Sequence, residues 1–174
     1  MFNDKYILTQ AVLAGTKTMT RRLLKDNVPL GNWEETAKHL PYKVGEVVAI
    51  AQRYKELYPN ADFEMVGNGF ITESAGWNNK MFVRANLMKH HIKITNVKIE
   101  RLQDISDDDI MREGVWQFYD NKNLFYVSKA VDYAPDVAFL TAREAFWYLI
   151  DKISGKGTWE NNPFVVAYSF KLID

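Results

Sequence analysis

One long alternating run of apolar and polar residues, at positions 91–102, constrains the fold of this chain more than any other feature. Side chains that recur every second residue lie on one face of a β-strand, so the pattern predicts a strand with one buried face. The apolar members of the run are Ile92, Ile94, Val97 and Ile99. The alternation slips at Asn96, which indicates a β-bulge at that position.

Other parts of the chain also carry strand patterns. Residues 47–51 form a short apolar run after a turn-like sequence, and residues 124–127 form a second one. Residues 163–173 are rich in aromatic and β-branched side chains and predict a final strand. The polar segment 55–80, with its glycines and asparagines, is predicted to be a strand or hairpin with long loops.

The N-terminal segment has the pattern of a helix. Asp4 is placed to cap a helix over residues 4–14, whose apolar residues recur at helical spacing. Gly15 stands where a helix C-terminus often places glycine. Residues 26–45 contain two prolines and two glycines and are predicted to be mostly loop.

Two later helices carry capping signals. Ser106 is predicted to cap a short helix that ends at Gly114, with Asp109 as the reciprocal carboxylate of a capping box. Residues 141–144 show a full capping-box pattern and predict a helix that ends at Gly155. The apolar face of that helix consists of Ala145, Phe146, Leu149, Ile150 and Ile153.

The order of these elements favours an α+β fold. Strands and helices do not alternate regularly, so a small mixed β-barrel with flanking helices is preferred over a parallel doubly wound sheet. The length of 174 residues suits one domain over residues 1–174.

Composition excludes several classes of protein. The chain has no cysteine, so disulfides, thiolate metal sites and a cysteine nucleophile are excluded. Its N-terminus lacks the pattern of a signal peptide, and no apolar stretch approaches the roughly 20 residues needed to span a bilayer. We therefore expect a cytoplasmic protein without a membrane partner. Basic and acidic residues balance at 22 each, which argues against non-specific duplex binding and leaves room for a local basic patch or a pocket for one nucleotide.

The segment after the first predicted helix carries the main chemical candidates. Lys17 and Thr20 lie three residues apart and are followed by Arg21 and Arg22. On a helical turn Lys17 and Thr20 would be close, whereas on an extended strand they would lie on opposite faces. An amine whose pKa is lowered by burial or by neighbouring cations can deprotonate a threonine hydroxyl, and arginines can bind phosphate. The alternative is a solvated basic segment without chemistry.

Glu113, at the end of the Ser106 helix, is the other candidate. A carboxylate there faces the negative end of the helix dipole, which indicates either a functional position or an ordinary cost on an exposed helix end. The aspartates around Ser106 are better explained as helix-start residues than as a metal cluster, and aromatics such as Trp116 are candidates for base stacking or for core packing. Nucleotide-binding glycine loops, metal-binding HExxH and GxSxG motifs are absent, so no metal or cofactor is predicted.

Four motifs together resemble the ASCH-domain family, in a variant common in phage and prophage genes. They are Gly15-Thr16-Lys17-Thr18-Met19-Thr20, Val44-Gly45-Glu46-Val47-Val48, the stretch from Ile94 to Val115 and Trp159-Glu160-Asn161-Asn162-Pro163-Phe164. The resemblance implies a PUA-like fold, a small β-barrel with flanking helices and a cleft, and a role in RNA or nucleoside recognition.

One branch of that family consists of amidohydrolases that deacetylate N4-acetylcytidine. Matching its motif to this chain implies Thr20 as nucleophile, Lys17 as base and Glu113 as the group that orients Lys17 or passes a proton to the leaving amine. Substrate or nucleic acid would then contact Thr18, Arg21, Arg22, Arg84 and Trp116. Compared with that branch this chain is longer, at residues 55–80 and 116–135.

Three functions therefore remain open. The first is an RNA- or nucleotide-binding module without catalysis, the second is a metal-independent amidohydrolase, and the third is a phage or mobile-element accessory domain that contacts other proteins. The sequence leaves the oligomeric state undetermined.

Overall fold

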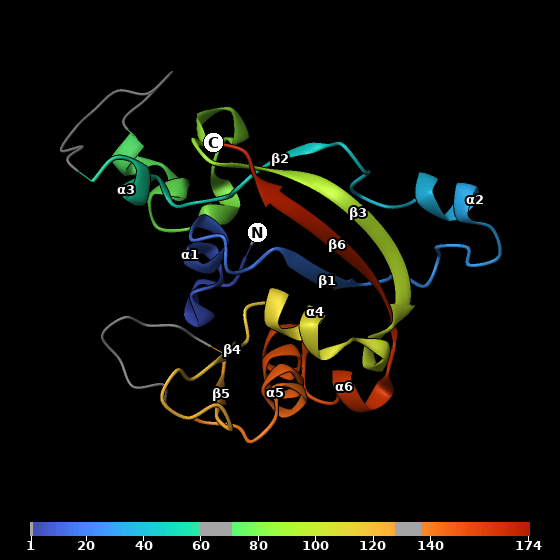
Figure 1. Ribbon diagram of the computed structural model, residues 1–174. Coiled ribbons are helices and arrows are strands. Elements are labelled where there is room, and N and C mark those ends of the chain that lie inside the picture. The colour runs from blue at the N-terminus through green and yellow to red at the C-terminus, as the bar shows by residue number, and fades with distance from the viewer. Residues whose placement is uncertain (1, 60–70, 128–136) are drawn as a thin grey trace.

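The structure is a computed structural model that describes residues 2–59, 71–127 and 137–174. Its centre is a four-stranded antiparallel sheet in the order β1-β6-β3-β2. The strands are β1 (Met19–Leu23), β2 (Val47–Ala49), β3 (His91–Arg101) and β6 (Phe164–Leu172). Figure 1 shows the long β3 and β6 strands curving together, so that the sheet curls into half a barrel. The predicted α+β class, with a small curved sheet and flanking helices, is confirmed.

The central pair, β3 and β6, are the two longest strands that the sequence predicts. They run antiparallel from the Ile92–Leu172 pair to the Arg101–Phe164 pair, and the register shifts between Ile94 and Asn96. This confirms the bulge predicted from the slipped alternation. A bulge bends its strand and increases the local twist, which fits the curvature of the sheet.

Strand β1 settles the two alternatives for the segment after Gly15. Met19–Leu23 is extended and pairs with β6, with Thr20 opposite Tyr168. Its inward positions are Met19 and Arg21, both buried. Burial alternates along this strand, but one of its buried positions is an arginine. Apolar residues therefore do not alternate in the sequence, and the strand cannot be recognised from its apolar pattern.

The first predicted helix is divided in two. A 3-10 turn, η1 (Asp4–Tyr6), is followed by α1 (Leu8–Leu13), and Ile7 between them has a left-handed φ of 54°. The capping side chain is that of Asn3 rather than the predicted Asp4. The Asp4 side chain instead lines the cavity described below.

Two predicted helix starts have their capping hydrogen bonds. Helix α4 (Asp107–Arg112) is capped by the Ser106 hydroxyl, which accepts from the Asp109 N–H at 3.2 Å. Helix α5 (Ala142–Ser154) has the complete capping box that residues 141–144 predict. Gly155 follows it with a positive φ of 112°, a backbone conformation that favours glycine.

The remaining elements are short. The sequence did not predict α2 (Trp33–Lys38), β4 (Trp116–Gln117) or α6 (Thr158–Asn161), whereas β5 (Phe125–Tyr126) lies in the predicted strand 124–127. The strand or hairpin predicted for 55–80 is absent from the described part of that segment. Its place is taken by the end of α3 (Tyr54–Leu57) and by the 3-10 turns η2 (Ile71–Glu73), η3 (Ala75–Trp77) and η4 (Lys80–Phe82). The part of the prediction at 60–70 lies outside the described residues. Two more 3-10 turns are η5 (Ala85–Leu87) and η6 (Leu102–Asp104).

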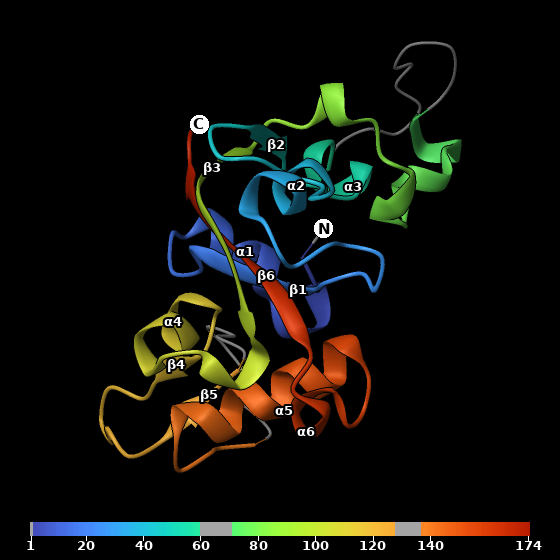
Figure 2. The same ribbon diagram turned by 90° about the vertical axis from the view of Figure 1, so that its right-hand side faces the viewer.

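The elements gather at two ends of the sheet. In Figure 2, α4, α5, α6 and the β4–β5 hairpin lie at one end, whereas α2, α3 and β2 lie at the other. The main hydrophobic core joins residues from both halves of the chain, including Val12, Phe146, Val165 and Tyr168. A smaller cluster forms around Tyr54. Within the described ranges, no helix has the length and apolar character needed to cross a bilayer.

Candidate functional site

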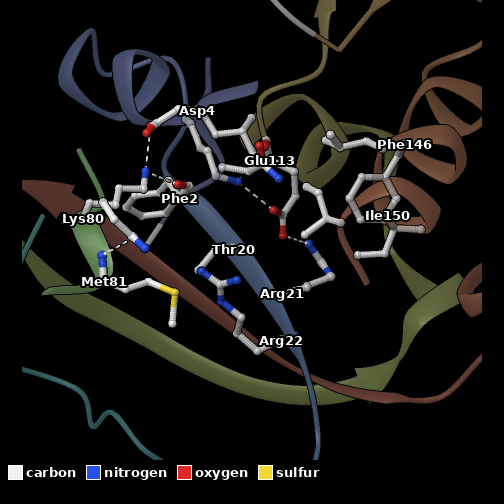
Figure 3. A pocket seen from close by; sticks show the side chains of 16 residues that line it. Phe2, Asp4, Thr20, Arg21, Arg22, Lys80, Met81, Glu113, Phe146 and Ile150 are labelled. Carbon is white, nitrogen blue, oxygen red and sulfur yellow. Dashed lines mark hydrogen bonds and ion pairs between the residues drawn. The ribbon is translucent and has the colours of Figure 1, made fainter. Parts of the chain in front are cut away.

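A cavity of about 370 Å³ opens along β1 and brings together most of the residues singled out from the sequence. Lys17, Thr20, Arg21, Arg22 and Glu113 all line it, although Glu113 is more than 90 positions from the others in the chain. Figure 3 shows Glu113 and Arg21 meeting above β1, with Thr20 and Arg22 beside them. The spatial convergence that the resemblance implies for Lys17, Thr20 and Glu113 is therefore present.

Lys17 lies at the base of this cavity and is only 2% exposed. Its ammonium nitrogen donates to the Met19 carbonyl oxygen at 2.7 Å, to the Glu113 carbonyl oxygen at 2.6 Å and to Glu113 Oε2 at 2.8 Å. Since an ammonium group has three N–H donors and no acceptor, all three are used. Burial lowers the pKa of Lys17 and the Glu113 carboxylate opposes that shift.

Glu113 joins the two buried cations of the site. It follows the last residue of α4 and is 4% exposed. While Oε2 accepts from Lys17, Oε1 accepts from Arg21 Nη1 at 3.1 Å. Two cations therefore offset both the burial of this carboxylate and its position at the negative end of a helix. Glu113 is not the exposed helix-end acid of the alternative interpretation.

Arg21 is held by carboxylates from three parts of the chain. Its Nε and Nη2 donate to Glu100 Oε1 on β3 at 2.9 and 2.5 Å, Nη2 donates to Asp109 Oδ2 on α4 at 3.1 Å, and Nη1 contacts Glu113 and Met19 Sδ. All five N–H donors of the guanidinium are thus engaged. Desolvation works against the charge, but Glu113 and Glu100 outweigh it and raise the pKa of Arg21. Arg21 therefore holds the surrounding carboxylates in place and has no N–H donor left for a ligand.

A second layer of charges supports Arg21. Asp109 accepts from Lys98 Nζ at 2.9 Å and from Arg112 Nη1 at 3.2 Å, in addition to Arg21. Desolvation alone would raise the pKa of Asp109, but hydrogen bonds from Lys98 and Arg21 outweigh it and lower the pKa. The prediction that Asp109 returns a capping bond to Ser106 is wrong because its carboxylate joins this ionic network.

Thr20 faces the cavity without taking part in the network. Because it lies opposite Tyr168 in the β1–β6 pair, the two side chains project from the same face of the sheet. Among the described residues its hydroxyl has no hydrogen-bond partner, so Lys17 and Thr20 share the cavity without being bonded to each other.

Three predicted ligand-binding residues lie elsewhere. The Thr18 hydroxyl accepts from Arg112 Nε at 3.1 Å, and the Arg84 backbone N–H donates to the Tyr54 hydroxyl. Trp116 stacks on Tyr126 in the β4–β5 hairpin, with ring centroids 5.0 Å apart. None of the three is among the described residues that line the cavity.

The cavity also contains residues that the sequence did not indicate. Lys80, at the end of the 55–80 segment, donates to Asp4 Oδ1 at 2.6 Å, to Thr9 Oγ1 at 3.2 Å and to the Phe2 carbonyl oxygen, and so closes one side (Figure 3). No local pattern could have indicated a contact between residues 76 positions apart. An apolar wall faces these charges and consists of Phe2, Leu8, Phe146, Leu149, Ile150 and Ile153.

The charge of the cavity differs from that of the whole chain. Four cationic and two anionic side chains line it, which leaves two net positive charges, whereas the chain as a whole is neutral. In the described ranges, no group of three or more His, Asp or Glu side chains is arranged to hold a metal ion. Lys17, Arg21 and Lys80 are each paired with carboxylates, so the arrangement is that of a charged pocket with an apolar side.

Comparisons with known proteins add one structural similarity. No family model matches this sequence, and no curated protein matches it. The crystal structure of an ASCH domain from Lactobacillus crispatus JV V101 aligns with 99% of this chain and 76% of that chain. The two are 15% identical in sequence, and the TM-score is 0.40.

Proposed function

We propose that this chain is an ASCH-type, PUA-like domain that binds a nucleotide, or a nucleotide unit of single-stranded RNA, in the cavity along β1. The observation that carries the proposal is the cavity itself, in which a net positive lining faces an apolar wall. The sequence motifs that resemble the ASCH family, including Lys17 and Thr20, supply residues of the same cavity.

The two sides of the cavity match the two parts of a nucleotide. A phosphate is attracted by cationic side chains, and the proposal assigns this role to Arg22, which lines the cavity from an outward position of β1. A base offers a flat apolar face, which an aromatic side chain of the lining such as Phe2 can contact. The small size of the cavity suits one such unit, not a duplex.

Binding to short oligonucleotides tests the proposal. Fluorescence anisotropy with labelled single-stranded RNA, and calorimetry with nucleoside monophosphates, should detect saturable binding that weakens as salt is raised. Arg22→Gln should reduce affinity about tenfold or less, as expected for the loss of one phosphate contact. Arg101→Gln removes a similar charge from an exposed position outside the cavity and should leave affinity unchanged. Equal binding by both variants, or none by the wild type, would contradict the proposal.

A second function, hydrolysis of an N4-acylated cytidine, is favoured by one further observation. The Thr20 hydroxyl lacks a partner among the described residues and shares the cavity with Lys17, whose pKa is lowered by burial. In this scheme Lys17 first passes a proton to Glu113 and becomes a neutral amine, because all three of its N–H bonds are otherwise donated.

The remaining steps follow ordinary acyl transfer. The amine accepts the Thr20 proton while the hydroxyl oxygen attacks the acyl carbon, and Lys17 then returns a proton to the departing cytidine nitrogen. Water hydrolyses the threonine ester that is formed and releases the acid. Turnover of N4-acetylcytidine by the wild type and its loss in Thr20→Ala, with nucleotide binding retained, would support this function. A wild type that binds cytidine derivatives but does not hydrolyse them would exclude it.

A further inference from the structure

A second cavity, of about 350 Å³, adjoins the first one. Phe2, Thr20 and Arg22 line both cavities, so the two meet at the outward positions of β1. Figure 3, which draws the first cavity, shows Thr20 and Arg22 projecting from β1. These shared side chains place the two cavities next to each other along β1.

The second cavity differs from the first in character. Arg22 is its one charged lining residue among those the structure describes, and its walls are otherwise apolar or aromatic. These walls include Tyr42, Ile92, Ile94, Tyr168 and Phe170. The first cavity is thus lined by several cations and the second is mainly apolar, and Thr20 borders both.

The second cavity also holds a buried polar group without a partner. The Tyr168 side chain is 1% exposed, and its hydroxyl makes no hydrogen bond among the described residues. Burial raises the pKa of Tyr168 to about 12; the backbone N–H of Tyr42 lies near and opposes this shift without reaching hydrogen-bond geometry. The hydroxyl is therefore neutral at physiological pH and is able both to donate and to accept.

An unpartnered buried hydroxyl costs stability, and the packing around it does not require one. Phenylalanine would fill the same space in the sheet without that cost. Tyr42 packs edge-on against the Tyr168 ring, with centroids 5.6 Å apart and planes at 77°. Tyr42 is partly exposed, lies between α2 and β2 and lines the same cavity as Tyr168.

We propose that the two cavities form one bipartite nucleotide site, in which the phosphate lies in the cationic cavity and the base enters the apolar one, where the Tyr168 hydroxyl hydrogen-bonds to the edge of the base. This inference rests on the proposed nucleotide-binding function and extends it to the orientation of the ligand. It also makes Tyr168 a specificity-determining residue, since a base edge that presents no matching group leaves the hydroxyl unpaired.

Calorimetry with the four common nucleoside monophosphates, their nucleosides and inorganic phosphate tests the orientation. Tyr168→Phe should weaken binding of at least one monophosphate by about three- to tenfold, as expected for one hydrogen bond. Its affinity for inorganic phosphate should be unchanged. Ala51→Phe, which fills the second cavity, should weaken all monophosphates and leave inorganic phosphate unaffected. Tyr126→Phe is the matched control, because Tyr126 is a buried tyrosine outside both cavities.

The outcomes separate the two proposals. If the wild type binds no nucleotide, the proposed function fails and this inference fails with it. If the wild type binds nucleotides and Tyr168→Phe binds all four with wild-type affinity, only the orientation is overturned. Thermal unfolding of each variant shows whether it is folded, and Tyr168→Phe decides the question should Ala51→Phe not fold.

Discussion

Lys17 and Glu113 are joined twice across 96 positions of the chain. The Lys17 ammonium donates to both the main-chain carbonyl and the side-chain carboxylate of Glu113. The first bond fixes the end of α4 beside β1, and the second neutralises a buried carboxylate. Four predictions follow from this contact and from the residues around it.

Replacing Glu113 with glutamine should destabilise the fold strongly. The change removes the negative charge that Lys17 and Arg21 share, and breaking a buried ion pair costs about 3–5 kcal/mol because it leaves an uncompensated charge. Urea unfolding measures the free energy. Glu160→Gln, at an exposed position on α6, is the control and should change stability by less than about 0.5 kcal/mol. Similar losses in the two variants would contradict the role of Glu113.

The double variant Lys17→Met and Glu113→Gln should be less destabilised than the two single variants predict together. In the double variant both charges of the pair are gone, so neither remains buried without its partner. A double-mutant cycle from urea unfolding should give a coupling of about 0.5–3 kcal/mol. Simple additivity would show that the two side chains do not act as a pair.

Stability should fall in acid through Asp109. Its pKa in the folded protein lies below the ordinary 3.8, so the unfolded chain binds the proton more readily. The stabilisation is therefore complete above about pH 4 to 5 and is lost as the pH falls through the folded-state pKa. Melting temperatures between pH 6 and 3 should decline less steeply in Asp109→Asn than in the wild type. Parallel declines would rule out this assignment.

Gly114→Ala should cost more stability than Gly15→Ala. Both glycines have a positive φ, at 104° and 72°, so alanine is strained at either position. At Gly114 a Cβ would also lie 2.9 Å from Leu8 Cδ2, whereas nothing lies within 4 Å at Gly15. We expect about 1–2 kcal/mol at Gly15 from the backbone alone and a larger loss at Gly114. Equal losses in thermal unfolding would mean that the contact with Leu8 relaxes freely.

The fold was predictable where a local pattern determined an element. The bulge at Asn96 appears as a slip in a period of two, and the capping box at residues 141–144 appears as a spacing of three. Strand β1 was not predictable in the same way, because Arg21 occupies a buried position where a strand pattern calls for an apolar residue. Its charge is tolerated only because carboxylates from β3 and α4 surround it.

The candidate site was predictable only in part. Matching the resembled motifs predicted that Lys17, Thr20 and Glu113 lie together, and all three line one cavity, whereas their roles stay a prediction. Lys80 and Tyr168 could not be found that way. Their positions depend on how segments far apart in the chain pack, and neither lies in a local pattern that indicates a pocket.

Alternate residues of β1 face different parts of the structure and are therefore under different constraints. Met19 and Arg21 point toward the buried network, whereas Thr20 and Arg22 point toward the junction of the cavities. In the proposed site, substitutions at the two outward positions would alter the surface that faces the ligand while the ionic scaffold stays intact. The proposed function thus allows ligand choice to change through alternate residues of a single five-residue strand.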